Sequence, residues 1–110
     1  MFQIKSRIWI ENNNGIFLGE GRIQLLKAIE NEGSLSKAAK SLNMSYKKAW
    51  NLIDAINKSA PKPIVQKSTG GSGGGGTIVT PYGRKKITQF ETLKQNCWDF
   101  MKAQNVLLQD

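Results

Sequence analysis

The residues best suited to chemistry in this chain are hydrogen-bond donors that cluster between Ser45 and Asn51. Lysine can donate to the acceptor atoms of guanine, and asparagine can pair with adenine in the major groove of DNA. Lys47 and Asn51 are four residues apart, so they would share one face of a helix. Ser45 and Tyr46 add hydroxyl groups at the start of that helix. These residue types in this spacing indicate contacts with base edges.

Neighbouring residues are candidates for contacts with the phosphate backbone, which give affinity without sequence preference. They are Lys48 in the same helix and Ser36 or Lys37 in the helix before it. Trp50 would either pack beneath its helix or touch the sugar backbone.

The composition argues against an enzyme and against a metal site. The chain has no histidine, few acidic residues and a single cysteine, Cys97. The commonest general base and the commonest metal ligand are therefore missing, and no nucleophile stands beside a base. We expect no catalytic residues, no metal and no cofactor. A single cysteine cannot form an internal disulfide, which is typical of proteins in a reducing cytoplasm.

The positive charge of the chain is concentrated in one region. Lysine and arginine number 16 against 8 aspartates and glutamates, a formal charge of +8. Ten of these cations but only one acid, Asp54, lie between Gly33 and Lys86. A localised basic field indicates a polyanionic partner. The chain has neither an apolar run of membrane-spanning length nor the pattern of a signal peptide, so we expect no membrane partner and a cytoplasmic location.

Two short helices joined by a tight turn would position the donors. Ser34 can cap a helix from about Leu35 to Leu42, and Ser45 can cap the next. Asn43 between them tolerates a left-handed conformation. Ala39 is small enough to let the two helices meet at a steep angle. This spacing is that of a DNA-binding helix-turn-helix, although an ordinary helical hairpin would show similar residues.

The segment before these helices predicts a β-hairpin and a supporting helix. Residues 2–10 alternate like a strand, Glu11–Gly15 is a turn signal, and Ile16–Leu18 would form the second strand. We expect Trp9 to be a packing residue. Residues Gly19–Gly33 have helical spacing of apolar side chains, and the helix would complete a three-helix core.

A second hairpin is predicted after the helix-turn-helix. Pro61 and Pro63 would end the helix that begins at Ser45. The short segments 64–67 and 77–80 would then form two strands on either side of a glycine-rich tip, which together are typical of a wing. Glycine amides at such a tip can approach a phosphate or enter a minor groove. The candidate contacts there are Thr69, Gly70, Gly71 and Ser72. A passive flexible linker is the alternative, and a nucleotide-binding loop is not supported by the residues that follow.

The final segment, from Pro81 or Tyr82 to about Leu108, reads as a long helix. Basic residues in its first turns oppose the helix dipole, which is reasonable if they face DNA phosphates; they are Arg84, Lys85 and Lys86. Apolar residues then recur at heptad spacing, which favours pairing of two copies over packing within one chain. The candidate dimerisation residues are Phe90, Leu93, Cys97, Phe100, Met101 and Leu107.

The chain resembles the N-terminal DNA-binding domain of the ModE family of molybdate-responsive transcription regulators in two segments, SLSKAAKSLNMSYKKAWNLI and STGGSGGGGTIVTPYGRK. Its helix-turn-helix is also similar to that of the wider LysR-type regulators. The resemblance covers about residues 19–100 and is most specific at Ser45–Trp50 and Thr69–Gly76. It implies a winged-helix homodimer that binds an operator of twofold symmetry, in a family that controls genes for molybdate uptake and molybdenum enzymes. Members carry molybdate-binding domains after this one, and residues for such a site are not seen here, so molybdate is not expected to bind this chain alone.

Together these features predict a mainly α-helical (α+β) fold, a winged helix-turn-helix with small β-hairpins. Residues 1–80 would form the DNA-binding domain with its N-terminal hairpin, and residues 81–110 the dimerisation helix. The predicted function is that of a sequence-specific, ModE-type transcription regulator that lacks a molybdate-binding domain, with double-stranded DNA and a second copy of the chain as partners. An RNA-binding winged helix or a protein-interaction adaptor would show similar charge and fold, so both remain alternatives.

Overall fold

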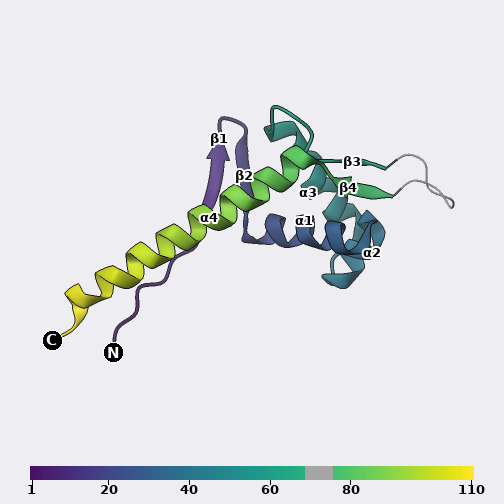
Figure 1. Cartoon of the computed structure of the whole chain (residues 1–110). Coiled ribbons are helices and arrows are strands. Elements are labelled where there is room, and N and C mark those ends of the chain that lie inside the picture. Colours follow the sequence, from purple (N-terminus) through teal and green to yellow (C-terminus); the bar gives the residue numbers. More distant parts are fainter. Residues whose placement is uncertain (69–75) are drawn as a thin grey trace.

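The computed structural model describes residues 1–68 and 76–110. The described part of the chain has three short helices and two hairpins, followed by a long last helix. Figure 1 shows this last helix running out from the other elements as an arm. The molecule accordingly measures 63 × 28 × 21 Å. The prediction of a mainly helical fold with two small antiparallel hairpins is confirmed. The elements in order are β1 (Trp9–Asn12), β2 (Gly15–Gly19), α1 (Glu20–Glu32), α2 (Leu35–Ser41), α3 (Tyr46–Ser59), β3 (Val65–Lys67), β4 (Thr77–Val79), α4 (Pro81–Gln104) and the 3-10 helix η1 (Asn105–Leu108).

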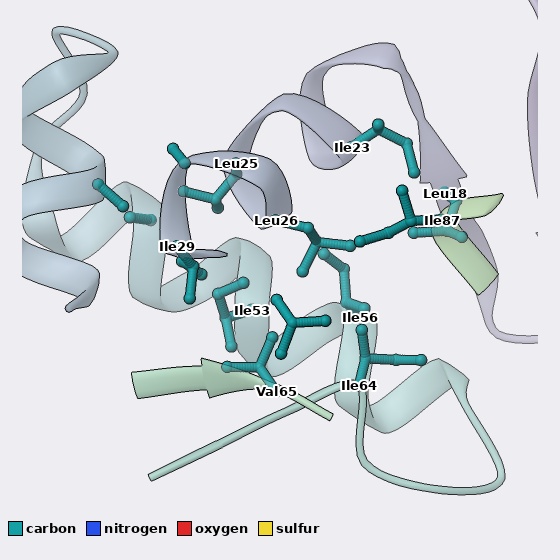
Figure 2. Close-up of a cluster of buried hydrophobic side chains, with 14 of the residues drawn as sticks. Leu18, Ile23, Leu25, Leu26, Ile29, Ile53, Ile56, Ile64, Val65 and Ile87 are labelled. Atoms are coloured by element: carbon teal, nitrogen blue, oxygen red, sulfur yellow. The ribbon is translucent and has the colours of Figure 1, made fainter. Parts of the chain in front are cut away.

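The hydrophobic core lies where the first three helices meet the wing strands and the start of α4 (Figure 2). Helix α1 contributes five buried residues to this core. Its apolar side chains recur at helical spacing, so they gather on one side of the helix and face the other elements. Burying each of these large aliphatic side chains contributes roughly 1.5–3 kcal/mol. Gly33 ends α1 in a left-handed conformation with a φ of 72°, as expected for a helix stop. The fully or nearly fully buried side chains include Leu18, Ile23, Leu25, Leu26, Ile29, Ile56, Ile64 and Phe90.

The N-terminal hairpin is shorter than the sequence predicts. Strand β1 pairs with β2 only from Trp9 to Asn12, and residues 2–8 form no strand. Strand β2 ends at Gly19, where α1 begins, so the earlier residues have no strand left to pair with. They run beside the outer part of α4 instead (Figure 1), and the Ile4 amide donates to Asn105 Oδ1 at 3.0 Å. The expectation of a strand over residues 2–10 is therefore wrong for most of its length.

Trp9 does not take the packing role expected of it. Its side chain is 51% exposed, and its indole Nε1 donates to Glu11 Oε1 at 2.8 Å. The bulge between Ile10 and Glu11 changes the register of the hairpin beside it. The expectation that Trp9 serves the core is corrected by this exposure.

The second hairpin is the predicted wing. Strands β3 and β4 are antiparallel, and Val65 pairs with Val79 at the end that enters the core. Both strands agree with the predicted segments to within one residue. The predicted contacts Thr69, Gly70, Gly71 and Ser72 lie outside the described residues.

Helix α4 begins at Pro81, as predicted, and its start is fixed by Thr80. The Thr80 Oγ1 accepts the Gly83 amide at 2.9 Å and donates to the Pro63 carbonyl at 2.7 Å. Gly83, Ile87 and Phe90 are the buried residues of the helix, so only its first part packs on the core. Beyond Gln104 the chain tightens into the 3-10 helix η1.

Candidate nucleic-acid interface

Local hydrogen bonds set the angle between α2 and α3. Ser34 Oγ accepts the Lys37 amide at 3.1 Å, and Ser45 Oγ accepts the Lys48 amide at 3.1 Å, so both helices are capped as predicted. Asn43 in the turn has a φ of 53°, the left-handed conformation that asparagine tolerates best after glycine. The Met44 amide then donates to the Ala39 carbonyl at 2.9 Å. The turn therefore returns directly onto α2, as in a helix-turn-helix.

Small residues allow this close crossing. Ala38 and Ala39 of α2 and Ala49 of α3 are all fully or almost fully buried. A larger side chain at Ala39 would hold the two helices apart, because a packed interior has no spare volume. The predicted role of Ala39 agrees with its burial.

The outward face of α3 carries the predicted base contacts. Ala49, Ile53 and Ile56 are buried on one side of this helix. With 3.6 residues per turn, Lys47 and Asn51 lie almost opposite that side, and both are exposed. They are carried by a helix whose other face is anchored in the core, so the backbone that presents them is fixed before any partner binds.

The flanks of α3 differ from each other. Tyr46 and Trp50 lie on one flank, one helical turn apart, and are 56% and 50% exposed. Half of the Trp50 side chain is therefore open to solvent, and its contact with the sugar backbone stays a prediction. Lys48 lies on the other flank, in the groove that Leu52 and Trp98 also line.

Helix α2 presents Ser36 and Lys37 in its first turn, and both are exposed. Lys40 is also exposed in its last turn. Among the described residues, no carboxylate forms an ion pair with Lys37, Lys40, Lys47 or Lys48. The positive field of the helix-turn-helix is therefore not neutralised within the chain, and it is available to an anion.

Asn57 is a residue whose role the sequence did not reveal. Its Oδ1 accepts the amides of Ile64 at 2.8 Å and Val65 at 3.2 Å, and its Nδ2 donates to the Val65 carbonyl at 2.9 Å. Asn57 belongs to α3, so the helix that presents Lys47 also fixes the start of the wing. The one signal in the sequence for this role is that Asn57 stands shortly before Pro61 and Pro63, where a helix is expected to end.

The three cations at the start of α4 do not behave alike. Arg84 Nε lies 3.0 Å from Glu30 Oε2, so its guanidinium already has an anionic partner in α1. The Lys86 ammonium lies 5.3 Å from the centre of the Tyr82 ring, and Lys62 lies 5.5 Å from the same ring. Arg84 therefore has an acidic neighbour within the chain, and the expectation that all three cations face phosphates stays a prediction. Lys85 is exposed.

The predicted dimerisation residues fall into two groups. Phe90 is fully buried in the core of its own chain, so its assignment to a dimer surface is corrected. Heptad spacing alone cannot distinguish a helix that packs on its own domain from one that packs on a partner. The later residues lie on the arm: Leu93 and Phe100 are exposed, Cys97 and Met101 are half-buried, and Leu107 is exposed in η1.

Other kinds of site receive no support from the described residues. No group of acidic, histidine or cysteine side chains there is suited to hold a metal ion. Of the described helices, none is long and apolar enough to cross a membrane.

Comparisons with known proteins agree with this geometry. Residues 21–84 match the family described as "Bacterial regulatory helix-turn-helix protein, lysR family". Molybdenum transport protein ModE of Azotobacter vinelandii is 44% identical over 89 residues, which cover 81% of this chain and 33% of that protein. Transcriptional regulator ModE of Haemophilus influenzae is 37% identical over 86 residues, 78% of this chain and 34% of that protein. DNA-binding transcriptional dual regulator ModE of Escherichia coli is 41% identical over 80 residues, which cover 73% of this chain and 30% of that protein. The chain spans about a third of the length of these relatives.

Proposed function

Because the chain belongs to the lysR family of bacterial regulatory helix-turn-helix proteins, we propose that it is a DNA-binding transcription regulator of the ModE type. The single observation that carries the proposal is the outward face of α3. Lys47 and Asn51 stand exposed on a helix that is anchored in the core on its other side. Donors fixed in this way can read base edges in a major groove, which admits one α-helix.

The exposed residues of the helix-turn-helix and of the start of α4 would have two roles. Some would contact bases and so select a sequence, and the others would contact the sugar-phosphate backbone and so give affinity. Lys47 and Asn51 would donate to bases, with Ser45 and Tyr46 at the leading end of the helix. Trp50, on the flank shared with Tyr46, would contact the sugar backbone. The exposed cations around them would neutralise phosphates and so give affinity for any sequence; they are Lys37, Lys48 and Lys85, with the Ser36 hydroxyl beside them.

The arm supports a homodimer as the DNA-binding form. The chain exposes 7737 Å², whereas a compact monomer of its 12.2 kDa mass would expose about 6,100 Å². The excess, about 1,600 Å² per chain, is larger than the roughly 800 Å² that each partner of a standard protein–protein interface buries, so the extended shape offers enough surface for a second copy. Phe100, Leu107 and Val106 are among the large apolar side chains left exposed along the arm, and a second copy would cover them. Two recognition helices related by a twofold axis would then read half-sites separated by about one turn of DNA, roughly 34–36 Å, or a multiple of it.

The genes under control are proposed from the relatives. These relatives include the Molybdenum transport protein ModE of Azotobacter vinelandii and the Transcriptional regulator ModE of Haemophilus influenzae. Genes for molybdate uptake or molybdenum enzymes are accordingly the proposed targets, with the cytoplasm as the location.

The direct experiment is selection of bound duplexes from a random pool of DNA with the purified chain. We expect a consensus with two inverted half-sites, because each chain of a twofold dimer presents the same α3 face. Structured RNA serves as the competitor and should not displace the selected duplex. Recovery of unrelated sequences, or preferential binding of the RNA, would contradict the proposed function.

A further inference from the structure

The base of the wing is joined to the helix-turn-helix through two glycines. The Ser68 amide donates to the Gly76 carbonyl at 2.9 Å, which extends the pairing of β3 and β4 by one step. On its other side, the Thr77 amide of β4 donates to the Gly33 carbonyl at 3.0 Å. Gly33 follows α1 directly and precedes Ser34, the cap of α2. The wing therefore hydrogen-bonds to the backbone immediately before the first helix of the helix-turn-helix.

This junction leaves no room for a side chain at position 76. A Cβ placed there would lie 2.5 Å from the Gly33 carbonyl oxygen, whereas carbon–oxygen contacts in proteins are usually about 3.3–3.6 Å. The obstacle is a backbone atom and not the end of a flexible side chain. Any other residue at position 76 must therefore push the base of the wing away from Gly33 by roughly 1 Å.

We propose that Gly76 is a positioning residue for DNA binding: its missing side chain lets the wing lie against Gly33, which fixes the direction of the wing relative to α2 and α3. The inference rests on the proposed function and adds a residue that need not touch DNA. The junction links the exposed Lys67 of β3 to the exposed Lys37 in the first turn of α2. Phosphate contacts from the two elements would then keep a fixed spacing relative to each other.

The test compares Gly76→Ala with a matched glycine substitution in the whole 110-residue chain. Binding to a fluorescein-labelled duplex of random sequence is followed by anisotropy over a series of salt concentrations. Gly76→Ala should bind roughly fivefold more weakly or worse near physiological salt and should lower the salt slope by about one, which is the loss of one phosphate contact. Gly21→Ala is the control, because a Cβ at that exposed helical position meets nothing within 4 Å; it should bind as the wild type does.

A double-mutant cycle separates positioning from general damage. In the wild-type background Lys67→Ala should weaken binding roughly fivefold. In the Gly76→Ala background it should cost almost nothing more, because the displaced wing no longer brings Lys67 to its phosphate. Circular dichroism of every variant reports the folded fraction. If Gly76→Ala does not fold, a cycle of Lys37→Ala and Lys67→Ala in the otherwise wild-type chain replaces it, since two phosphate contacts held at a fixed spacing should show costs that do not add; additive costs there would contradict the inference.

Three results would overturn the inference. The first is a folded Gly76→Ala variant with wild-type affinity and salt slope. The second is an equal cost of Lys67→Ala in both backgrounds, which would mean that the junction does not position the wing. The third is a Lys67→Ala variant of unchanged affinity. A wild-type chain that shows no salt-dependent binding to duplex DNA would instead refute the proposed function, together with the inference that rests on it.

Discussion

Replacing Phe100 with glutamate should convert the proposed dimer into folded monomers. Phe100 is 65% exposed on α4, beyond Phe90, the last residue of that helix in the core. An aromatic side chain buries roughly 150–250 Å² when it is enclosed, so a partner would cover about 130 Å² of each Phe100. At about 25 cal/mol per Å² this burial contributes about 3 kcal/mol per chain.

Both copies of Phe100 change in the dimer, so the loss is about 6 kcal/mol, or roughly a 10⁴-fold weaker association. The cost of enclosing a charged glutamate in an apolar interface would add to it. Sedimentation equilibrium over a range of protein concentrations measures the dissociation constant. Helix content by circular dichroism should stay unchanged, since the residue supports no part of the core.

Thr88→Glu is the matched control for charge and helix propensity. Thr88 is exposed on α4, and in the heptad pattern it lies opposite the apolar seam. This variant should remain dimeric. A Phe100→Glu chain that sediments as a dimer of wild-type affinity would refute the assignment of the arm as the dimer interface.

Four further substitutions test the turn, the start of α4 and the phosphate contacts. Asn43→Gly should keep or slightly raise the melting temperature, whereas Asn43→Ala should lower stability by roughly 1–2 kcal/mol because the φ of 53° is left-handed. Gly83→Ala should destabilise the fold by at least about 1–3 kcal/mol in thermal unfolding, because its Cβ would lie 2.4 Å from the Ile64 carbonyl oxygen; a melting temperature equal to that of wild type would contradict the packing described. Lys85→Ala should weaken binding to all duplexes alike and reduce the salt slope by about one, and a change in sequence preference would argue against a phosphate contact.

Features that depend on neighbouring residues in the chain could be predicted from the sequence. Ser34 and Ser45 cap the helices that follow them, Asn43 takes the left-handed turn, and Gly33 ends α1. Each of these roles requires only a side chain and the backbone within a few residues. The order of the helices and the wing strands follows from such signals.

Features that depend on distant parts of the chain could not be predicted. The exposed Trp9 and the absence of a strand over residues 2–8 reflect where β2 ends. The Arg84–Glu30 pair joins residues that are 54 positions apart. Phe90 has the spacing of a coiled-coil residue, and only its three-dimensional neighbours reveal that it belongs to the core. Burial and pairing of this kind become visible once the helices are placed against one another.

The central claim is that the outward face of α3 reads base pairs, and Lys47→Ala tests it most directly. Selection from a random pool of duplexes, run in parallel with the wild type, compares the two consensus sequences. We expect the Lys47→Ala chain to lose preference at one position in each half-site, at a cost of about 1–3 kcal/mol for the preferred base, and to retain the others. An unchanged consensus with uniformly weaker binding would contradict the claim, because Lys47 would then contact only phosphate.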